Sequence, residues 1–102
     1  MNDIYNTEQI AVLLSLLKTD LQLLSSAFDN YLMQLLSAAV EFITREGIKL
    51  TNSAEDMQLV QMYAAYLYRK RAQDDPVMPR MLRFALNNRL FSQKMSEQQT
   101  EA

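Results

Sequence analysis

The sequence predicts an all-α fold, a small bundle of four helices that forms a single domain over residues 1–94. Two observations support this fold class. The 102-residue chain contains 49% hydrophobic residues but one glycine and two prolines, a composition typical of compact helical proteins. Apolar residues also recur at intervals of three and four, the spacing of a helical stripe, along four separate segments. We therefore expect helices over about residues 7–17, 27–46, 53–72 and 79–93.

The first expected helix starts at a capping box. Asn6 and Gln9 have the spacing at which each side chain can accept the other residue's backbone N–H. The apolar stripe that follows consists of Ile10, Leu13, Leu14 and Leu17. The polar residues 18–20 indicate a break after Leu17, although the leucine-rich residues 21–24 would also allow the helix to continue. Because those leucines are too apolar for an exposed loop, we expect this connection to pack on the core.

The second expected helix is bounded by a serine and a glycine. Ser25 or Ser26 can cap its first turn. Its apolar stripe consists of Phe28, Leu32, Leu35, Ala39 and Phe42. Gly47 stands at the position C′, where a left-handed residue closes a helix, and Ile48 would then fold back against Ile43. Gly47 is therefore predicted to be a structural residue.

The third expected helix is the centre of the predicted bundle. Its apolar stripe consists of Met57, Val60, Ala64 and Leu67. Further leucine, methionine and tyrosine residues widen that stripe almost to the full circumference, and such a helix must be covered by other elements. Leu67 is therefore expected to be buried. Asn52 or Ser53 can cap this helix, and Glu55 and Asp56 in its first turn complement the helix dipole.

The fourth expected helix starts at a proline. Asp74, Asp75 and Pro76 indicate a turn that ends the third helix. Pro79 suits the first position of the next helix, because its missing N–H would have no helical partner there. The stripe of this helix consists of Leu82, Ala85, Leu86 and Leu90, with Phe91 at its margin. Residues 95–102 are polar, and we expect them to form a flexible, disordered tail.

The charges are divided unevenly along the chain. Residues 1–56 carry a net charge of −5, residues 57–94 a net charge of +5, and the tail restores the overall charge of −2. Such a split can supply unlike surfaces that attract each other in an assembly. It can equally serve to keep the outer helix faces solvated.

The composition argues against catalysis. The sequence contains no cysteine and no histidine, which excludes thiolate nucleophiles, disulfides and the commonest zinc ligand. It also lacks a glycine-rich phosphate loop. A turn explains the adjacent Asp74 and Asp75 better than a catalytic site does, and packing explains the tyrosines of the third helix better than base stacking does. We expect no enzyme activity, no cofactor and no metal ion.

Neither a membrane span nor a secretion signal is expected. The longest apolar run, residues 10–17, is interrupted by Ser15 and is too short to cross a bilayer. The N-terminus lacks the basic residues of a signal peptide. We expect a soluble intracellular protein.

Four segments, taken together, resemble one family of known proteins. They are LLKTDLQL at residues 16–23, YLMQLLSAAVEFITREG at 31–47, LVQMYAAYLYRKR at 59–71 and MPRMLRFALNNRLF at 78–91. Their order is similar to that of the small helical head–tail connectors of tailed bacteriophages, the adaptors that complete the head. The resemblance covers nearly the whole chain apart from its termini. This chain differs in its short link between the second and third helices, where relatives often carry a longer loop.

The resemblance implies a structural function in the virion. Connectors of this kind form a ring beneath the portal protein, extend the channel through which genomic DNA passes without sequence reading, and dock the next neck or tail protein. The protein would then lie at the head–tail junction, and in the host cytoplasm during assembly. A ring needs head-to-tail contacts between unlike surfaces. We expect the subunit or portal interface to include Arg69, Lys70, Arg71, Arg80, Arg83 and Phe91.

Two other functions stay open on the sequence. The third and fourth helices carry most of the basic residues, as in a small DNA-binding regulator, but their connection is long, acidic and without glycine. A sequence pI near 5.0 also argues against DNA binding. The other alternative is a small helical protein that binds and inhibits a partner.

Overall fold

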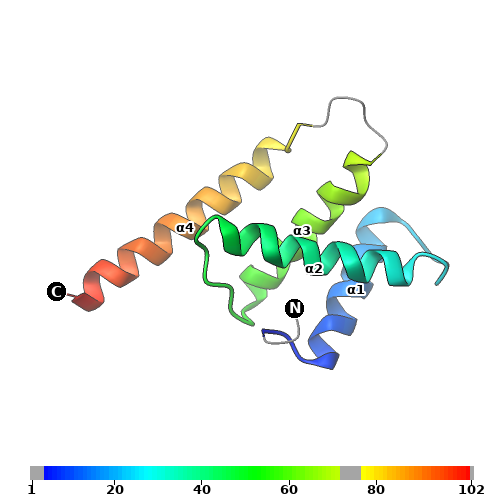
Figure 1. Ribbon diagram of the computed structural model, residues 1–102, viewed down its shortest axis with the longest axis horizontal. Helices are drawn as coiled ribbons and strands as arrows, with labels where there is room; N and C mark the ends of the chain where they lie inside the picture. Colours follow the sequence, from blue (N-terminus) through cyan, green and yellow to red (C-terminus); the bar gives the residue numbers. More distant parts are fainter. Residues whose placement is uncertain (1–3, 72–76, 102) are drawn as a thin grey trace.

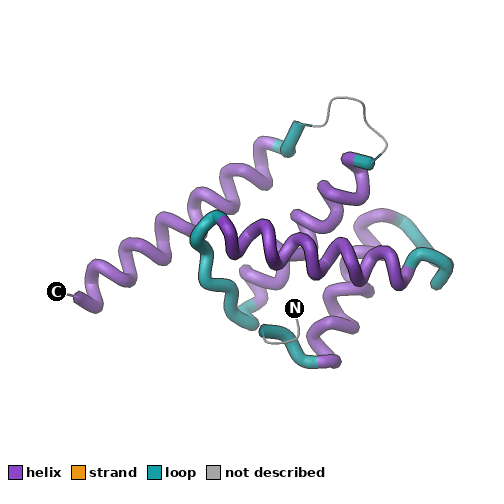
Figure 2. Tube along the Cα trace, viewed as in Figure 1, coloured by secondary structure: helices purple, strands orange, loops and turns teal. Residues whose placement is uncertain are grey.

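The computed structural model of the protein describes residues 4–71 and 77–101. The described residues form four helices, α1 (Thr7–Leu21), α2 (Asp29–Arg45), α3 (Ala54–Lys70) and α4 (Arg80–Glu101), as Figure 1 shows. Helices and loops account for all of these residues, and no strand occurs among them (Figure 2). The predicted all-α bundle of four helices is therefore confirmed.

α3 lies at the centre of this bundle. It packs against α1, α2 and α4, and α1 also packs against α2. α4 runs along one edge of the molecule, and its C-terminal half projects away from the other helices (Figure 1). The predicted central position of this helix is confirmed, but its covering is incomplete. Gln58 is exposed, and Leu67, which we expected to be buried, is only half-buried.

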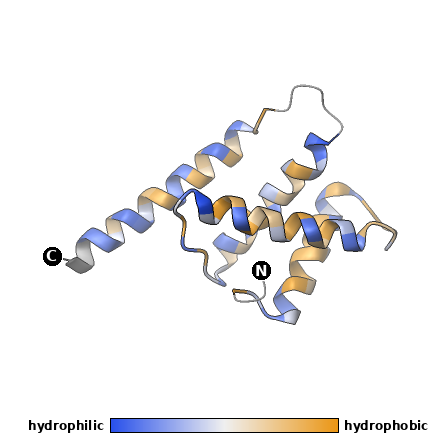
Figure 3. Ribbon diagram, viewed as in Figure 1, coloured by the Kyte–Doolittle hydropathy of each residue, from blue (hydrophilic) through white to orange (hydrophobic). Residues whose placement is uncertain are grey.

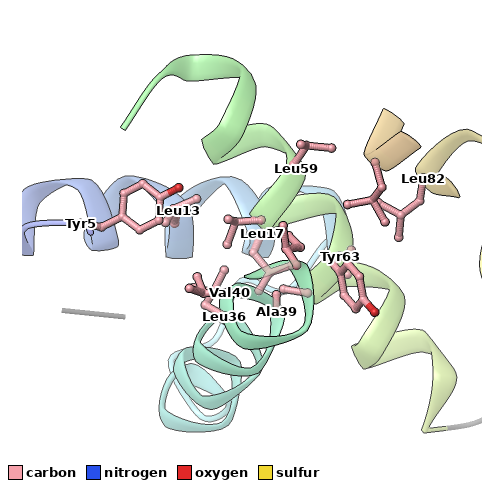
Figure 4. Close-up of a cluster of buried hydrophobic side chains, with 14 of the residues drawn as sticks. Tyr5, Leu13, Leu17, Leu36, Ala39, Val40, Leu59, Tyr63 and Leu82 are labelled. Atoms are coloured by element: carbon pink, nitrogen blue, oxygen red, sulfur yellow. The ribbon is translucent and has the colours of Figure 1, made fainter. Parts of the chain in front are cut away.

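The core fills the space between α1, α2 and α3 and reaches the inner face of α4 (Figure 4). The buried residues labelled in that figure are Tyr5, Leu13, Leu17, Leu36, Ala39, Val40, Leu59, Tyr63 and Leu82. Tyr5 precedes α1, and its hydroxyl donates a hydrogen bond to the carbonyl oxygen of Thr51 at 2.9 Å. This bond fastens the segment before α1 to the link between α2 and α3.

The predicted start of α1 is confirmed, whereas its predicted end is wrong. The N–H of Gln9 donates to Asn6 Oδ1 at 2.8 Å and the N–H of Asn6 donates to Gln9 Oε1 at 3.0 Å, which completes the capping box. The helix continues past residue 17 to Leu21, because Leu21 packs partly buried against the core. It closes at Gln22, which adopts a left-handed conformation with φ of 59°.

α2 begins two residues later than predicted and ends as predicted. Neither serine caps it: its N-cap is Phe28, and the Oγ of Ser25 instead accepts the N–H of Ala27 within the preceding turn. At the other end Gly47 has φ of +99°, and its N–H donates to the carbonyl oxygen of Thr44 at 3.0 Å. The following residue, Ile48, is buried in the same core as Ile43.

α3 starts at the predicted cap and ends slightly early. The hydroxyl of Ser53 accepts the N–H of Asp56 at 3.2 Å, and the helix closes at Lys70 instead of near residue 72. The predicted turn residues Asp74, Asp75 and Pro76 lie outside the described residues.

Both predicted ends of α4 need correction. The carbonyl oxygen of Pro79 accepts the N–H of Arg83 at 3.1 Å, so Pro79 is the residue before the helix and not its first residue. At the other end residues 94–101 continue the helix, although we expected it to stop near residue 93 and residues 95–102 to be disordered. An ion pair of 3.0 Å between Lys49 Nζ and Glu97 Oε1 holds the added turns against the link between α2 and α3. None of the helices in the described ranges is long and apolar enough to cross a membrane.

Candidate interaction surfaces

α4 presents apolar side chains on two opposite faces. Its inner face buries Leu82 and Leu86 in the core. Its outer face, together with Val77 three residues before the helix, exposes a row of large apolar side chains; the exposed fractions are 76% for Val77, 77% for Met81, 56% for Phe84, 66% for Phe91 and 42% for Met95. Figure 3 shows apolar and polar residues alternating along α4 beyond the body of the protein. We call these five residues the outer row.

A buried ion pair sets the position of α4. Arg89 Nε donates to Asp56 Oδ1 at 2.6 Å, and Arg89 Nη2 donates to Asp56 Oδ2 at 3.0 Å. The backbone N–H and the hydroxyl of Thr51 each donate to Asp56 Oδ2 at 2.8 Å. Asp56 is buried, so its charge is tolerable only because these donors satisfy it.

The same face of α4 holds the link between α2 and α3 through backbone groups. Arg89 Nη2 donates to the carbonyl oxygen of Lys49 at 3.0 Å. Gln93 Oε1 accepts the N–H of Lys49 at 2.7 Å, and Gln93 Nε2 donates to the carbonyl oxygen of Gly47 at 2.8 Å. Backbone groups of Gly47 and Lys49 thus obtain hydrogen-bond partners from α4, which a link without secondary structure requires.

Electrostatics at this network favour the charged pair. Burial opposes ionisation of Asp56, but the hydrogen bonds from Arg89 and Thr51 outweigh it and hold the pKa of that carboxyl below 3.8, its ordinary value. The hydrogen bond to Asp56 raises the pKa of Arg89. Burial, followed by the charge of Asp56, raises the pKa of the Tyr5 hydroxyl from 10.0 to about 12. Asp56 and Arg89 therefore stay ionised, and Tyr5 stays neutral, near pH 7.

A second apolar surface lies along α1. An open groove of about 770 Å³ runs between this helix and the segment that leads to α2. Its lining residues are Ala11, Leu14, Ser15, Lys18, Thr19, Gln22, Leu23 and Leu24. Leu24 at its edge is 99% exposed, and Val12 and Leu16 on the neighbouring side of α1 are about half exposed. α1 and α4 lie on opposite sides of α3, so these two apolar surfaces belong to different helices (Figure 1).

The predicted interface residues at the end of α3 are held by contacts within the chain. Arg69 Nη2 lies 3.4 Å from Asp20 Oδ2, an exposed pair. Lys70 Nζ lies 5.9 Å from the centre of the Tyr66 ring. Both basic residues border a groove that also includes Pro79 at the start of α4. The structure therefore brings Arg69 and Lys70 near the start of the fourth helix.

Arg71 lies among aromatic rings. Its guanidinium carbon is 4.3 Å from the ring centre of Tyr68, 5.3 Å from that of Tyr31 and 5.6 Å from that of Phe28. Its Nη2 also donates to the Tyr68 hydroxyl at 3.1 Å. These cation–π contacts join the start of α2 to the end of α3. They give Arg71 a structural role that the sequence did not indicate.

The predicted interface residues of α4 separate into two groups. Arg83 Nη2 donates to both carboxylate oxygens of Glu46, at 2.8 Å and 2.7 Å. Arg80 is exposed, and Phe91 belongs to the outer row. Arg80 and Phe91 are thus accessible to another protein, whereas Arg83 is engaged with the end of α2.

The uneven charge distribution is partly compensated inside the protein. Three ion pairs join the acidic half of the sequence to the basic half: Asp20–Arg69, Glu46–Arg83 and Asp56–Arg89. The charges of these six residues are therefore satisfied without a neighbouring subunit. Among the predicted interface arginines, Arg71 and Arg80 form no ion pair with a described residue, and of these two Arg71 is held by aromatic rings.

Two features of these surfaces were missed in the sequence analysis. Asp56 was interpreted as a residue that complements the helix dipole, and no local pattern links it to Arg89, 33 residues away. The outer row, by contrast, was visible as regular spacing between residues 77 and 95, but we assigned only the stripe that faces the core. A helix in a small protein usually buries one apolar stripe, and a second stripe on the opposite face was therefore not expected.

In residues 4–71 and 77–101, no group of histidine, cysteine, aspartate or glutamate residues is placed to hold a metal ion.

Comparison with known proteins found no matching family model, no matching curated protein and no matching solved structure.

Proposed function

We propose that this protein is a structural assembly subunit, a head–tail connector that forms a ring between the portal protein and the next neck or tail component of a tailed bacteriophage. In this function it extends the DNA channel without reading sequence and carries out no catalysis. Its site of action is the head–tail junction of the virion. The assignment to connectors in particular, among structural assembly proteins, rests on the resemblance of four sequence segments to that family.

The observation that best supports an assembly function is the pair of unlike apolar surfaces on opposite sides of α3. One is the outer row of α4, and the other is the groove along α1. Large exposed apolar side chains on a small protein mark sites of interaction. A closed ring requires two different surfaces on each subunit, because each copy contacts one neighbour with one surface and the next neighbour with the other.

Fewer of the predicted basic residues are available for contacts between subunits than the sequence suggested. Arg69 and Arg83 already have acidic partners within the chain, so they are poor candidates for contacts between subunits. Arg80 remains available beside the outer row, where its planar guanidinium suits a carboxylate of the portal or of a neighbour. We expect apolar contacts to supply most of the affinity and Arg80 to help set orientation.

The test is to mix the purified protein with the portal protein of the same phage and to examine the particles by electron microscopy. We expect a ring of added density coaxial with the portal. Arg80→Glu should weaken this ring, whereas Arg69→Ala, which removes an intramolecular pair, should leave it intact. Equal ring formation by wild type and Arg80→Glu would remove Arg80 from the interface.

Other outcomes would support the alternative functions. Sequence-specific binding of duplex DNA, without any portal binding, would contradict the connector proposal and favour a regulator. A stable one-to-one complex with a single protein, and no ring, would favour an inhibitor.

A further inference from the structure

We propose that, in the free protein, the outer row of α4 packs against the same row of a second copy as a short, parallel, in-register coiled coil. This inference goes beyond the ring function and does not depend on it, because it concerns the protein without portal. The occupant of this apolar face would be α4 of an identical chain.

The spacing of the outer row is that of a coiled-coil seam. The helical members of the row, Met81, Phe84, Phe91 and Met95, follow one another at steps of three, seven and four residues, and Asn88 divides the step of seven into four and three. Steps that alternate between four and three repeat every seven residues, which is the heptad pattern. Met81, Asn88 and Met95 then occupy position a, and Phe84 and Phe91 occupy position d, while Val77 lies before the helix.

The row is placed where a second helix can reach it. At 100° per residue the helical members of the row are centred almost opposite the buried residues Leu82 and Leu86. The body of the protein packs on that inner face, and α4 lies along an edge of the molecule (Figure 1). Two copies can therefore bring their outer rows together with their bodies on the outside.

Asn88 identifies the partner as an identical helix in the same direction. It is exposed and is the polar residue in an otherwise apolar row. In a parallel, in-register pair the two copies of Asn88 lie opposite each other and can exchange amide hydrogen bonds, a device that fixes register. In an antiparallel pair, where position a meets position d, Asn88 would face a phenylalanine and lose that partner.

The flanks of the row permit the parallel arrangement. Arg80 and Lys94 lie on one flank, at position g, and Ala85 and Ser92 lie on the other, at position e. A parallel pair sets position g of one helix against position e of the other. The basic flank of each copy therefore meets a neutral flank, without like charges in opposition.

The available area predicts a weak pair. The five exposed side chains present on the order of 500 Å² per copy, given that a phenylalanine offers roughly 150–250 Å² when fully exposed. Two copies would bury about 1,000 Å², near the lower limit for a specific interface. We therefore expect pairing that depends on protein concentration and that a tighter contact with portal or ring neighbours can displace.

Sedimentation of the full-length protein over a range of concentrations tests the pairing. The wild type should shift from the 11.8 kDa monomer toward twice that mass as concentration rises. Phe84→Ser with Phe91→Ser should abolish the shift while the far-UV circular dichroism stays unchanged. The matched control, Val12→Ser with Leu16→Ser, alters two apolar residues of similar exposure on α1 and should pair like the wild type.

Oxidative cross-linking tests direction and register, and the absence of native cysteine makes it specific. Met81→Cys lies at one end of the row, so it forms a disulfide between copies only when the helices are parallel and in register. Lys94→Cys on the flank is the control and should cross-link much more slowly.

Three results would overturn the inference: a wild type that stays monomeric at every concentration, pairing that survives the two serine substitutions, or Met81→Cys that cross-links no faster than Lys94→Cys. Each is measured without portal. Failure of the pairing would therefore leave the ring proposal standing, and failure to form portal rings would leave the pairing standing.

Discussion

The two faces of α4 differ in the contacts that their side chains make. The inner face combines buried leucines with a buried ion pair, and it ties α4 to α3 and to the link between α2 and α3. The outer face carries side chains of similar size but finds no covering within the described chain. One helix therefore contributes to the stability of the fold through one side and exposes large apolar side chains through the other. Substitutions on the two faces should have separable effects.

The largest effect is expected from the buried ion pair. Arg89→Ala leaves Asp56 buried without its main partner, and breaking such a pair typically costs about 3–5 kcal/mol. Urea denaturation followed by circular dichroism would measure this loss. The exposed pair serves as the control, because Arg69→Ala should cost about 0–1 kcal/mol. A loss below 1 kcal/mol for Arg89→Ala would mean that the network does not hold α4.

Leucine truncations should give the next largest loss and should distinguish the core from its margin. Leu86 is fully buried on the inner face, so Leu86→Ala should cost about 2–5 kcal/mol of unfolding free energy. Leu67 is only half-buried, so Leu67→Ala should cost clearly less, although the sequence pattern predicted a fully buried residue. Equal losses for the two variants, measured by urea denaturation, would contradict this ranking.

Gly47 should give an intermediate effect that depends on the substituted residue. Its φ of +99° disfavours any side chain, and a Cβ atom there would meet only ordinary contact with Leu90 Cδ1 at 3.7 Å. The cost is therefore conformational, roughly 1–2 kcal/mol, and larger for Val than for Asn, which tolerates left-handed backbone better. Thermal melts of Gly47→Val and Gly47→Asn would compare them. Identical melting temperatures would remove the capping argument.

A smaller effect is expected from pH. Because the folded-state pKa of Asp56 lies below its ordinary value of 3.8, its ionisation stabilises the fold above that pH. This contribution is lost as the pH falls through the folded-state pKa. Asp56→Asn should therefore show a shallower loss of stability below pH 3.8 than the wild type, as acid titration of the unfolding free energy would reveal. Parallel acid profiles would exclude Asp56 as a source of acid sensitivity.

The raised pKa of Tyr5 gives the opposite dependence at high pH. A folded-state pKa of about 12, against 10.0 in the unfolded chain, means that stability is complete below pH 10 and falls as the pH rises toward 12. Tyr5→Phe should reduce this alkaline slope, although it also removes the hydrogen bond to Thr51.

Local patterns in the sequence predicted most of the fold. The capping box at Asn6 and the left-handed Gly47 depend on neighbouring residues, and both were predicted correctly. The extension of α4 to Glu101 was missed, because the residues after Met95 carry no apolar stripe and because the pair of Lys49 with Glu97 leaves no local pattern in the sequence. Ion pairs across the chain were missed for the same reason. Sequence charge alone suggested free interface arginines, and Arg83 proved to be engaged with Glu46.

The outer face should give the smallest effect on stability and the clearest effect on assembly. Exposed substitutions typically change the unfolding free energy by less than about 0.5 kcal/mol, so Phe84→Ser with Phe91→Ser should melt like the wild type. Its sedimentation, alone and mixed with portal protein, is the most direct test of separate roles for the two faces. We predict that the wild type pairs when alone and joins the portal in a larger complex. The variant should stay a folded monomer both alone and in the presence of portal protein. A folded variant that pairs and binds portal like the wild type would contradict an assembly role for the outer face.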